Sequence, residues 1–322
     1  MRFALVGLAF VVFAVLAPPA WATFPGRNGL LAFSLYVFNE ESTEIDIDEN
    51  FVGIADIPGG ARHIFARGSS PSYSPDGRTL AYSGPGRGIW LTRPDCRWPK
   101  DRSSPPPCSR LRRVTRGDDL SPAWSPTGKR IAFVRSGLSR YGLSYRIYTV
   151  RANGGGLRFL GRATWPAMDW SSKGALAFTG AGGRLRVRGS GGRVRTLPVR
   201  GREPSWAPAG NRLAFVGEEE EPQAAEGTAL YTIHENGTGL RKIWEFEDQY
   251  AGRFAGVSSP IWSPDGRWIA FIATFDPITT GSVFAIRPRG SGLRLIMRPI
   301  KDCLPCSYDP YLGGLSWRAL RR

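Results

Sequence analysis

The sequence predicts an all-β protein built as a six-bladed β-propeller. Its 40 Gly and 26 Pro make up about a fifth of the 322 residues and follow no short period, which indicates many tight turns. The hydrophobic content of 42% is sufficient for a packed core. An internal repeat recurs at the spacing of propeller blades, and this repeat determines the choice of fold.

Each copy of the repeat combines an aromatic anchor, a turn of the Pro-Asp-Gly type and an apolar run. Residues 70–82 read SPSYSPDGRTLAY and residues 259–271 read SPIWSPDGRWIAF, while three further copies occupy 121–133, 165–178 and 203–215. The anchors are Tyr73, Trp124, Trp170, Trp206 and Trp262, which are 51, 46, 36 and 56 residues apart. Because the anchors recur in the first strand of each unit, we expect them to pack between blades rather than to stack on carbohydrate.

One repeat unit contains four strands, in agreement with a propeller blade. The aromatic strand and the following apolar strand are joined by a turn whose Gly accepts positive φ. A third strand is predicted at 146–150 and a fourth at 157–160, separated by the Gly-rich turn 153–156. The fourth strands also carry Arg158, Arg195, Arg241 and Arg294, whose charge discourages pairing between sheet edges.

The two ends of the chain supply the sixth blade together. Residues 28–33 match the second strand of the repeat, and residues 313–318 match the first. Trp317 follows Trp262 by 55 residues, so it continues the repeat. We therefore expect the C-terminal strand to complete the N-terminal blade and close the ring.

The N-terminus carries the pattern of a secretory signal peptide. An uncharged apolar run at 3–17 is followed by Ala20-Trp21-Ala22, a small-residue cleavage site. We predict a signal peptide at 1–22, a propeller domain at 23–322, and a secreted or periplasmic protein with no other membrane segment. Retention of the same run as an N-terminal anchor is the alternative.

The repeats resemble the TolB-type WSPDG family of β-propellers over nearly the whole chain after residue 22. This resemblance implies the propeller fold and an extracytoplasmic setting. Its functional content is weaker, because the family includes partner-binding periplasmic proteins, accessory domains of prolyl-oligopeptidase-like enzymes and lyases. The chain has no room for the α/β domain of TolB or for a hydrolase domain, so a stand-alone propeller is expected.

The formal charge of +16 does not by itself predict nucleic-acid binding. The basic residues are 38 Arg and only five Lys, and they are spread along the chain rather than gathered in one tail. Many of them recur at repeat positions. We therefore expect no nucleic-acid partner.

No catalytic residues are predicted. The sequence has no Gly-x-Ser-x-Gly stretch, and its two histidines, His63 and His234, fall in separate blades. A shared metal site or catalytic triad is therefore not expected, and we predict no cofactor. An acid/base pair of carboxylates stays open, as does a divalent cation, although no EF-hand-like spacing occurs.

Four cysteines fit an oxidising compartment. Cys96 and Cys108 flank an insertion in blade two, whereas Cys303 and Cys306 lie before the closing strand. Because these two loops belong to opposite faces of a propeller, we predict Cys96–Cys108 and Cys303–Cys306 disulfides rather than a four-cysteine zinc site.

The acidic residues are distributed unevenly. In a propeller, the loops from second to third strand and from fourth to next first strand share one face. The predicted binding residues on that face are Glu40, Glu41, Glu44, Glu218, Glu219, Glu220 and Glu221 in two loops, with Asp118, Asp119, Trp165, Glu203 and Asp309 before first strands.

This distribution predicts a monomeric, non-catalytic scaffold that uses an acidic face to bind a basic peptide or a cationic protein patch. The simpler interpretation of these loops is that they are solvated insertions. The alternative function is a propeller enzyme, a lyase or hydrolase, that acts on an extracellular glycan or peptide.

Overall fold

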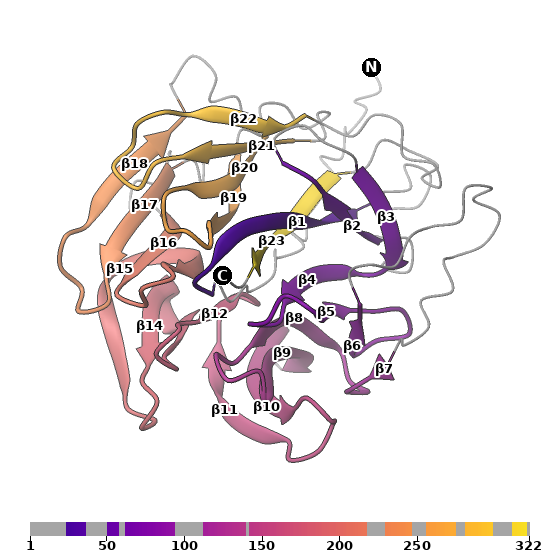
Figure 1. Ribbon diagram of the computed structural model, residues 1–322. Coiled ribbons are helices and arrows are strands. Elements are labelled where there is room, and N and C mark those ends of the chain that lie inside the picture. Colours follow the sequence, from indigo (N-terminus) through magenta and orange to yellow (C-terminus); the bar gives the residue numbers. More distant parts are fainter. Residues whose placement is uncertain are drawn as a thin grey trace, which may run out of the picture.

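The computed structural model describes residues 24–36, 50–57, 62–93, 112–139, 142–217, 229–246, 256–274, 281–298 and 311–320. These residues form antiparallel strands, with a single short 3-10 turn at Ala181–Gly183. Figure 1 shows the strands arranged as blades around a central axis. The predicted all-β, six-bladed propeller is confirmed. Within this part of the chain, no helix is long and apolar enough to cross a membrane.

Each blade is a four-stranded antiparallel sheet whose first strand is innermost. Blade 1 contains β23 (Tyr311–Leu320), β1 (Arg27–Tyr36), β2 (Phe51–Ala55) and β3 (Arg62–Arg67). Blade 2 contains β4 (Ser69–Tyr73), β5 (Leu80–Ser83), β6 (Ile89–Thr92) and β7 (Arg112–Arg113). Blade 3 contains β8 (Asp119–Trp124), β9 (Arg130–Ser139), β10 (Gly142–Arg151) and β11 (Arg158–Ala163).

The other half of the ring continues the same order. Blade 4 contains β12 (Met168–Trp170), β13 (Leu176–Thr179), β14 (Arg184–Arg188) and the first part of β15 (Val194–Trp206). Blade 5 contains the second part of β15, β16 (Arg212–Gly217), β17 (Ala229–His234) and β18 (Arg241–Glu245). Blade 6 contains β19 (Gly256–Trp262), β20 (Ile269–Thr274), β21 (Ser282–Ile286) and β22 (Arg294–Met297).

The continuous strand β15 differs from the sequence prediction. Its N-terminal part pairs with β14, and its C-terminal part pairs with β16, so blades 4 and 5 form one seven-stranded sheet. Pro198 and Gly201 favour a break between two strands, but Pro198 is exposed and the chain runs on in extended form. Glu203 therefore lies inside a strand rather than in a loop before one.

The C-terminal strand closes the ring as predicted. β23 pairs with β1 in the register Leu31↔Trp317, Ala32↔Ser316 and Phe33↔Leu315. The two strands lie side by side in Figure 1 although they come from opposite ends of the chain. This pairing removes the free edge that an incomplete first blade would expose.

The aromatic anchors lie between blades, as expected. Tyr73 and Trp206 are among the largest fully buried side chains. The backbone N–H of Trp206 donates to Asp169 Oδ2 at 2.6 Å, and its indole N–H donates to the Asp169 carbonyl at 3.2 Å. Likewise, the N–H of Tyr73 donates to Ser316 Oγ at 3.0 Å. Both anchors therefore connect their own blade to the preceding one.

Candidate functional site at the mouth face

The candidate site lies where the innermost strands begin and the second strands end, which we call the mouth face. The structure describes Asp118, Asp119, Trp165 and Glu203 there. The remaining predicted residues are Glu40, Glu41, Glu44, Glu218, Glu219, Glu220, Glu221 and Asp309, and they fall outside the described residues together with Cys96, Cys108, Cys303 and Cys306. The placement of the two acidic loops on the mouth face therefore remains a prediction, as do both disulfides.

Asp119 is bound internally by an arginine. Its buried carboxylate accepts two hydrogen bonds from Arg135, from Nε at 2.6 Å and from Nη2 at 2.9 Å. The Arg135 guanidinium also lies 5.2 Å from the ring centre of Tyr148. Asp118 pairs with Arg87 at 2.9 Å, although both side chains are exposed. These two acids are paired within the protein before any partner arrives.

Glu203 lies at the junction of blades 5 and 6. Its carboxylate accepts the backbone N–H of Ser259 at 2.5 Å and lies 3.5 Å from Arg202 Nε. Arg202 stacks on the ring of Trp165 at 5.1 Å. Burial raises the pKa of Glu203 to about 7, although Arg202 and the Ser259 N–H favour the charged form. Glu203 and Trp165 are thus neighbours. The sequence predicted that both lie on the mouth face, but not that they are close to each other.

A repeated backbone irregularity surrounds this site. The φ values of Ser70, Ser121, Glu203 and Ser259 are 63°, 54°, 57° and 59°. Each of these residues lies three positions before the aromatic anchor of its blade and is followed by a proline. The corresponding residue of blade 1 is Gly314, with φ of 48°. Positive φ is costly for residues other than glycine, and such strain is concentrated at functional sites.

Two hydroxyl groups at these irregular positions have no hydrogen-bond partner. Ser121 Oγ and Ser259 Oγ are both buried and unsatisfied within the described part of the chain. Unsatisfied buried polar groups are rare in folded proteins and are candidates for contact with a ligand or water. They add polar capacity to the mouth face that sequence reasoning missed.

Tyr36, at the end of β1, is a further residue of the site that the sequence did not predict. Burial raises its pKa, and its hydroxyl lies among the hydroxyls of Ser34, Ser69 and Ser70. The charge of Glu203 raises the Tyr36 pKa further, which places the two groups within electrostatic reach of each other. Because they belong to blades 1 and 5, no sequence spacing could have related them.

The β9–β10 hairpin projects from the mouth face. Its pairs Gly137↔Ser144, Leu138↔Leu143 and Ser139↔Gly142 extend past the last residues that pair with β8 and β11. Leu138 is 87% exposed and Leu143 is 64% exposed. Directly opposite residues of an antiparallel pair share a face, so the two leucines form one exposed apolar tip. The sequence contained the signal, since Leu-Ser-x-x-Gly-Leu surrounds a turn.

No group of three or more metal-ligating side chains occurs among the described residues. His234 lies in blade 5 beside Arg212, with 2.9 Å between the His234 Nε2 and Arg212 Nη2 atoms. His63 belongs to β3 of blade 1. The arrangement therefore brings together acid–arginine pairs, hydroxyls and an exposed apolar tip.

No family model and no curated protein matches the sequence. Among solved structures, TolB from Acinetobacter baumannii is 15% identical, with a TM-score of 0.62 over 90% of this chain and 67% of that chain. A chain of a nidogen/laminin complex is 12% identical, with a TM-score of 0.62 over 91% of this chain and 100% of that chain. An oligogalacturonate lyase in complex with manganese is 11% identical, with a TM-score of 0.50 over 85% and 80%. At these identities the likeness is one of fold, and the fold of this chain is a TolB-like β-propeller.

Proposed function

We propose that the protein is a non-catalytic scaffold that binds a partner protein at the mouth face. The observation that carries this proposal is the apolar tip of Leu138 and Leu143, which is held away from the core on a two-stranded extension. Folding gains nothing from exposing two paired leucines, whereas a partner surface gains from covering them.

The partner is expected to combine an apolar patch with basic groups. The basic part of this proposal depends on the acidic loops that contain Glu40 and Glu218, because Asp118 and Asp119 already have arginine partners. A secreted or periplasmic location follows from the predicted signal peptide and disulfides. The fold supports a binding role, since similar propellers occur in TolB and in a nidogen/laminin complex.

The test is a cross-linking pull-down from the envelope and secreted fractions of the source organism. The wild type is compared with L138S/L143S and with the control L157S/L240S, which changes two other exposed leucines, 49% and 53% exposed. A captured protein is then purified and titrated. We expect the tip variant to bind it at least about tenfold more weakly, a loss of about 1.4 kcal/mol, while the control binds like the wild type.

The same titration separates the two parts of the proposal. Neutralising Glu40, Glu41, Glu44 and Glu218 through Glu221 should reduce affinity and its salt dependence if the partner is cationic. Equal affinity of the wild type and of the tip variant for every captured protein would refute the mouth face as the binding surface. Unchanged salt dependence in the loop variant would refute only the basic character of the partner.

A second candidate function is supported by Glu203. A buried carboxylate with a pKa of about 7, on a residue of positive φ, has the properties of a general acid or base. An oligogalacturonate lyase is among the proteins of similar fold. Incubation with acidic oligosaccharide and peptide libraries tests this function. Turnover by the wild type that is lost in Glu203→Gln, with unchanged folding, would replace the scaffold by an enzyme.

A further inference from the structure

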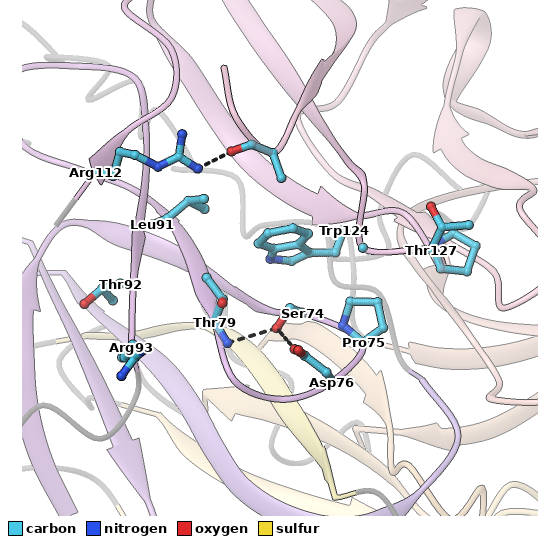
Figure 2. A pocket seen from close by; sticks show the side chains of 13 residues that line it. Ser74, Pro75, Asp76, Thr79, Leu91, Thr92, Arg93, Arg112, Trp124 and Thr127 are labelled. Carbon is cyan, nitrogen blue, oxygen red and sulfur yellow. Dashed lines mark hydrogen bonds between the residues drawn. The ribbon is translucent and has the colours of Figure 1, made fainter. Parts of the chain in front are cut away.

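A second concave site lies on the face opposite the mouth face, between blades 2 and 3. It is a cavity of about 770 Å³, formed by the β4–β5 and β8–β9 hairpins and by the ends of β6 and β7. Figure 2 shows that the indole of Trp124 lies between the two hairpins and that Arg112 lies across the cavity from Pro75. Its volume falls in the range of small-molecule sites.

The base of this inter-blade pocket is apolar. Leu91 and Trp124 are only 6% and 4% exposed, and Pro75 and Pro126 border them. The indole N–H of Trp124 donates to the Ser72 carbonyl at 3.1 Å, so the ring presents only its hydrocarbon part to the cavity. This surface suits a flat or branched hydrocarbon body.

The charged groups around this base are two arginines and one carboxylate. Arg93 and Arg112 line the pocket and are exposed. Arg112 donates one hydrogen bond to the Ala152 carbonyl, and its guanidinium has further donors. The one carboxylate of the lining belongs to Asp76. It accepts hydrogen bonds from Ser74 Oγ at 2.6 Å and from the Arg78 N–H at 3.1 Å, so it stabilises the turn between β4 and β5.

The electrostatic setting favours an anion. The chain contains 43 Lys and Arg against 27 Asp and Glu, a formal net charge of +16. A positive framework attracts anions over a distance, and paired arginines bind oxyanions by charge-assisted hydrogen bonds. A comparable pocket between blades 6 and 1 holds about 420 Å³, but there Arg294 stacks on Trp268 at 4.7 Å.

We propose that the inter-blade pocket binds a small organic oxyanion with an apolar body. The body lies on Leu91 and Trp124, and the guanidinium groups of Arg93 and Arg112 at the rim bind the oxyanion. This site is separate from the mouth face and does not depend on the function proposed there.

The experiment is a calorimetric titration of the purified protein with 2-naphthoate and with its neutral analogue 2-naphthylmethanol. The variant R93Q/R112Q removes both cationic side chains of the lining. The matched control R158Q/R241Q removes the same charge from exposed arginines of β11 and β18. Circular dichroism verifies that all variants retain the β-sheet content of the wild type.

We expect R93Q/R112Q to bind 2-naphthoate about tenfold or more weakly than the wild type and the control do. The neutral analogue should bind all three proteins equally. A third titration with 2-naphthyl phosphate distinguishes carboxylate from phosphate as the preferred oxyanion, and dependence on Arg93 and Arg112 supports the site in either case.

Two results would overturn the proposal. The first is no heat of binding for naphthoate or naphthyl phosphate up to about 5 mM with the wild type. The second is an equal loss of affinity in R93Q/R112Q and R158Q/R241Q, because net charge alone would then explain binding.

Discussion

The carboxyl group of Glu203 makes the stability of the ring dependent on pH. It is buried between blades 5 and 6, and its pKa of about 7 compares with an ordinary value of 4.5. A raised pKa means that the folded protein holds this proton more tightly than the unfolded chain does. The stabilisation is therefore fully present below pH 4.5 and is lost as pH rises through 7.

The expected magnitude follows from this shift. Each pKa unit corresponds to about 1.36 kcal/mol, so Glu203 should contribute a loss of about 3 kcal/mol between pH 4.5 and pH 8. Glu203→Gln keeps an acceptor for the Ser259 N–H but has no proton to lose. The variant, compared with the wild type, should gain stability by about this amount as pH rises.

Urea unfolding at five pH values from 4.5 to 8.5 measures this difference. Asp169, whose pKa burial also raises, is present in both proteins and cancels. The control is Glu245→Gln, which changes an exposed carboxylate paired with Lys242. If the difference in unfolding free energy between wild type and Glu203→Gln is independent of pH, the carboxyl titrates normally and the argument from burial is wrong.

Three further outcomes follow from the packing. Deleting residues 310–322 removes β23, so the protein should lose its cooperative calorimetric melting transition, and a soluble truncated protein with a sharp transition would contradict closure by this strand. Trp206→Ala should lower the unfolding free energy by about 3–5 kcal/mol in urea titrations, whereas Leu157→Ala, on an exposed residue, should change it by less than about 0.5 kcal/mol. Asp119→Asn removes the buried negative charge that pairs with Arg135 and should lower the unfolding free energy by about 3 kcal/mol in the same titrations. Asp118→Asn changes an exposed pair and should leave the unfolding free energy nearly unchanged.

The sequence predicted the fold because the repeat encodes both local and long-range structure. A Pro-x-Trp stretch predicts an inner strand, and its aromatic residue, such as Trp206, is large enough to fill the space between two blades. The half-repeats at the two ends required the pairing of β23 with β1. The arginines of the fourth strands, including Arg158 and Arg241, are exposed there as predicted.

The site was less predictable because its interactions join residues that are distant in sequence. No local pattern relates Tyr36 to Glu203, or indicates that Arg135 binds Asp119 from the neighbouring strand. The positive φ of Ser70 and its equivalents contradicts the usual extended preference of residues before proline. The exposure of Leu138 depends on how far β9 outruns β8, which residue types alone do not determine.

The long strand β15 has a mechanical consequence. Every other pair of consecutive blades is joined by separate strands, whereas here one extended segment from Val194 to Trp206 serves two sheets. Because its first part is hydrogen-bonded to β14 and its second part to β16, one unbroken extended backbone links the two sheets, so blades 4 and 5 should move as a single rigid unit. Thermal opening or a pulling force applied to the ends of the chain should therefore separate other blade boundaries first. For the same reason, sequence insertions should be tolerated less well at this junction than at the others.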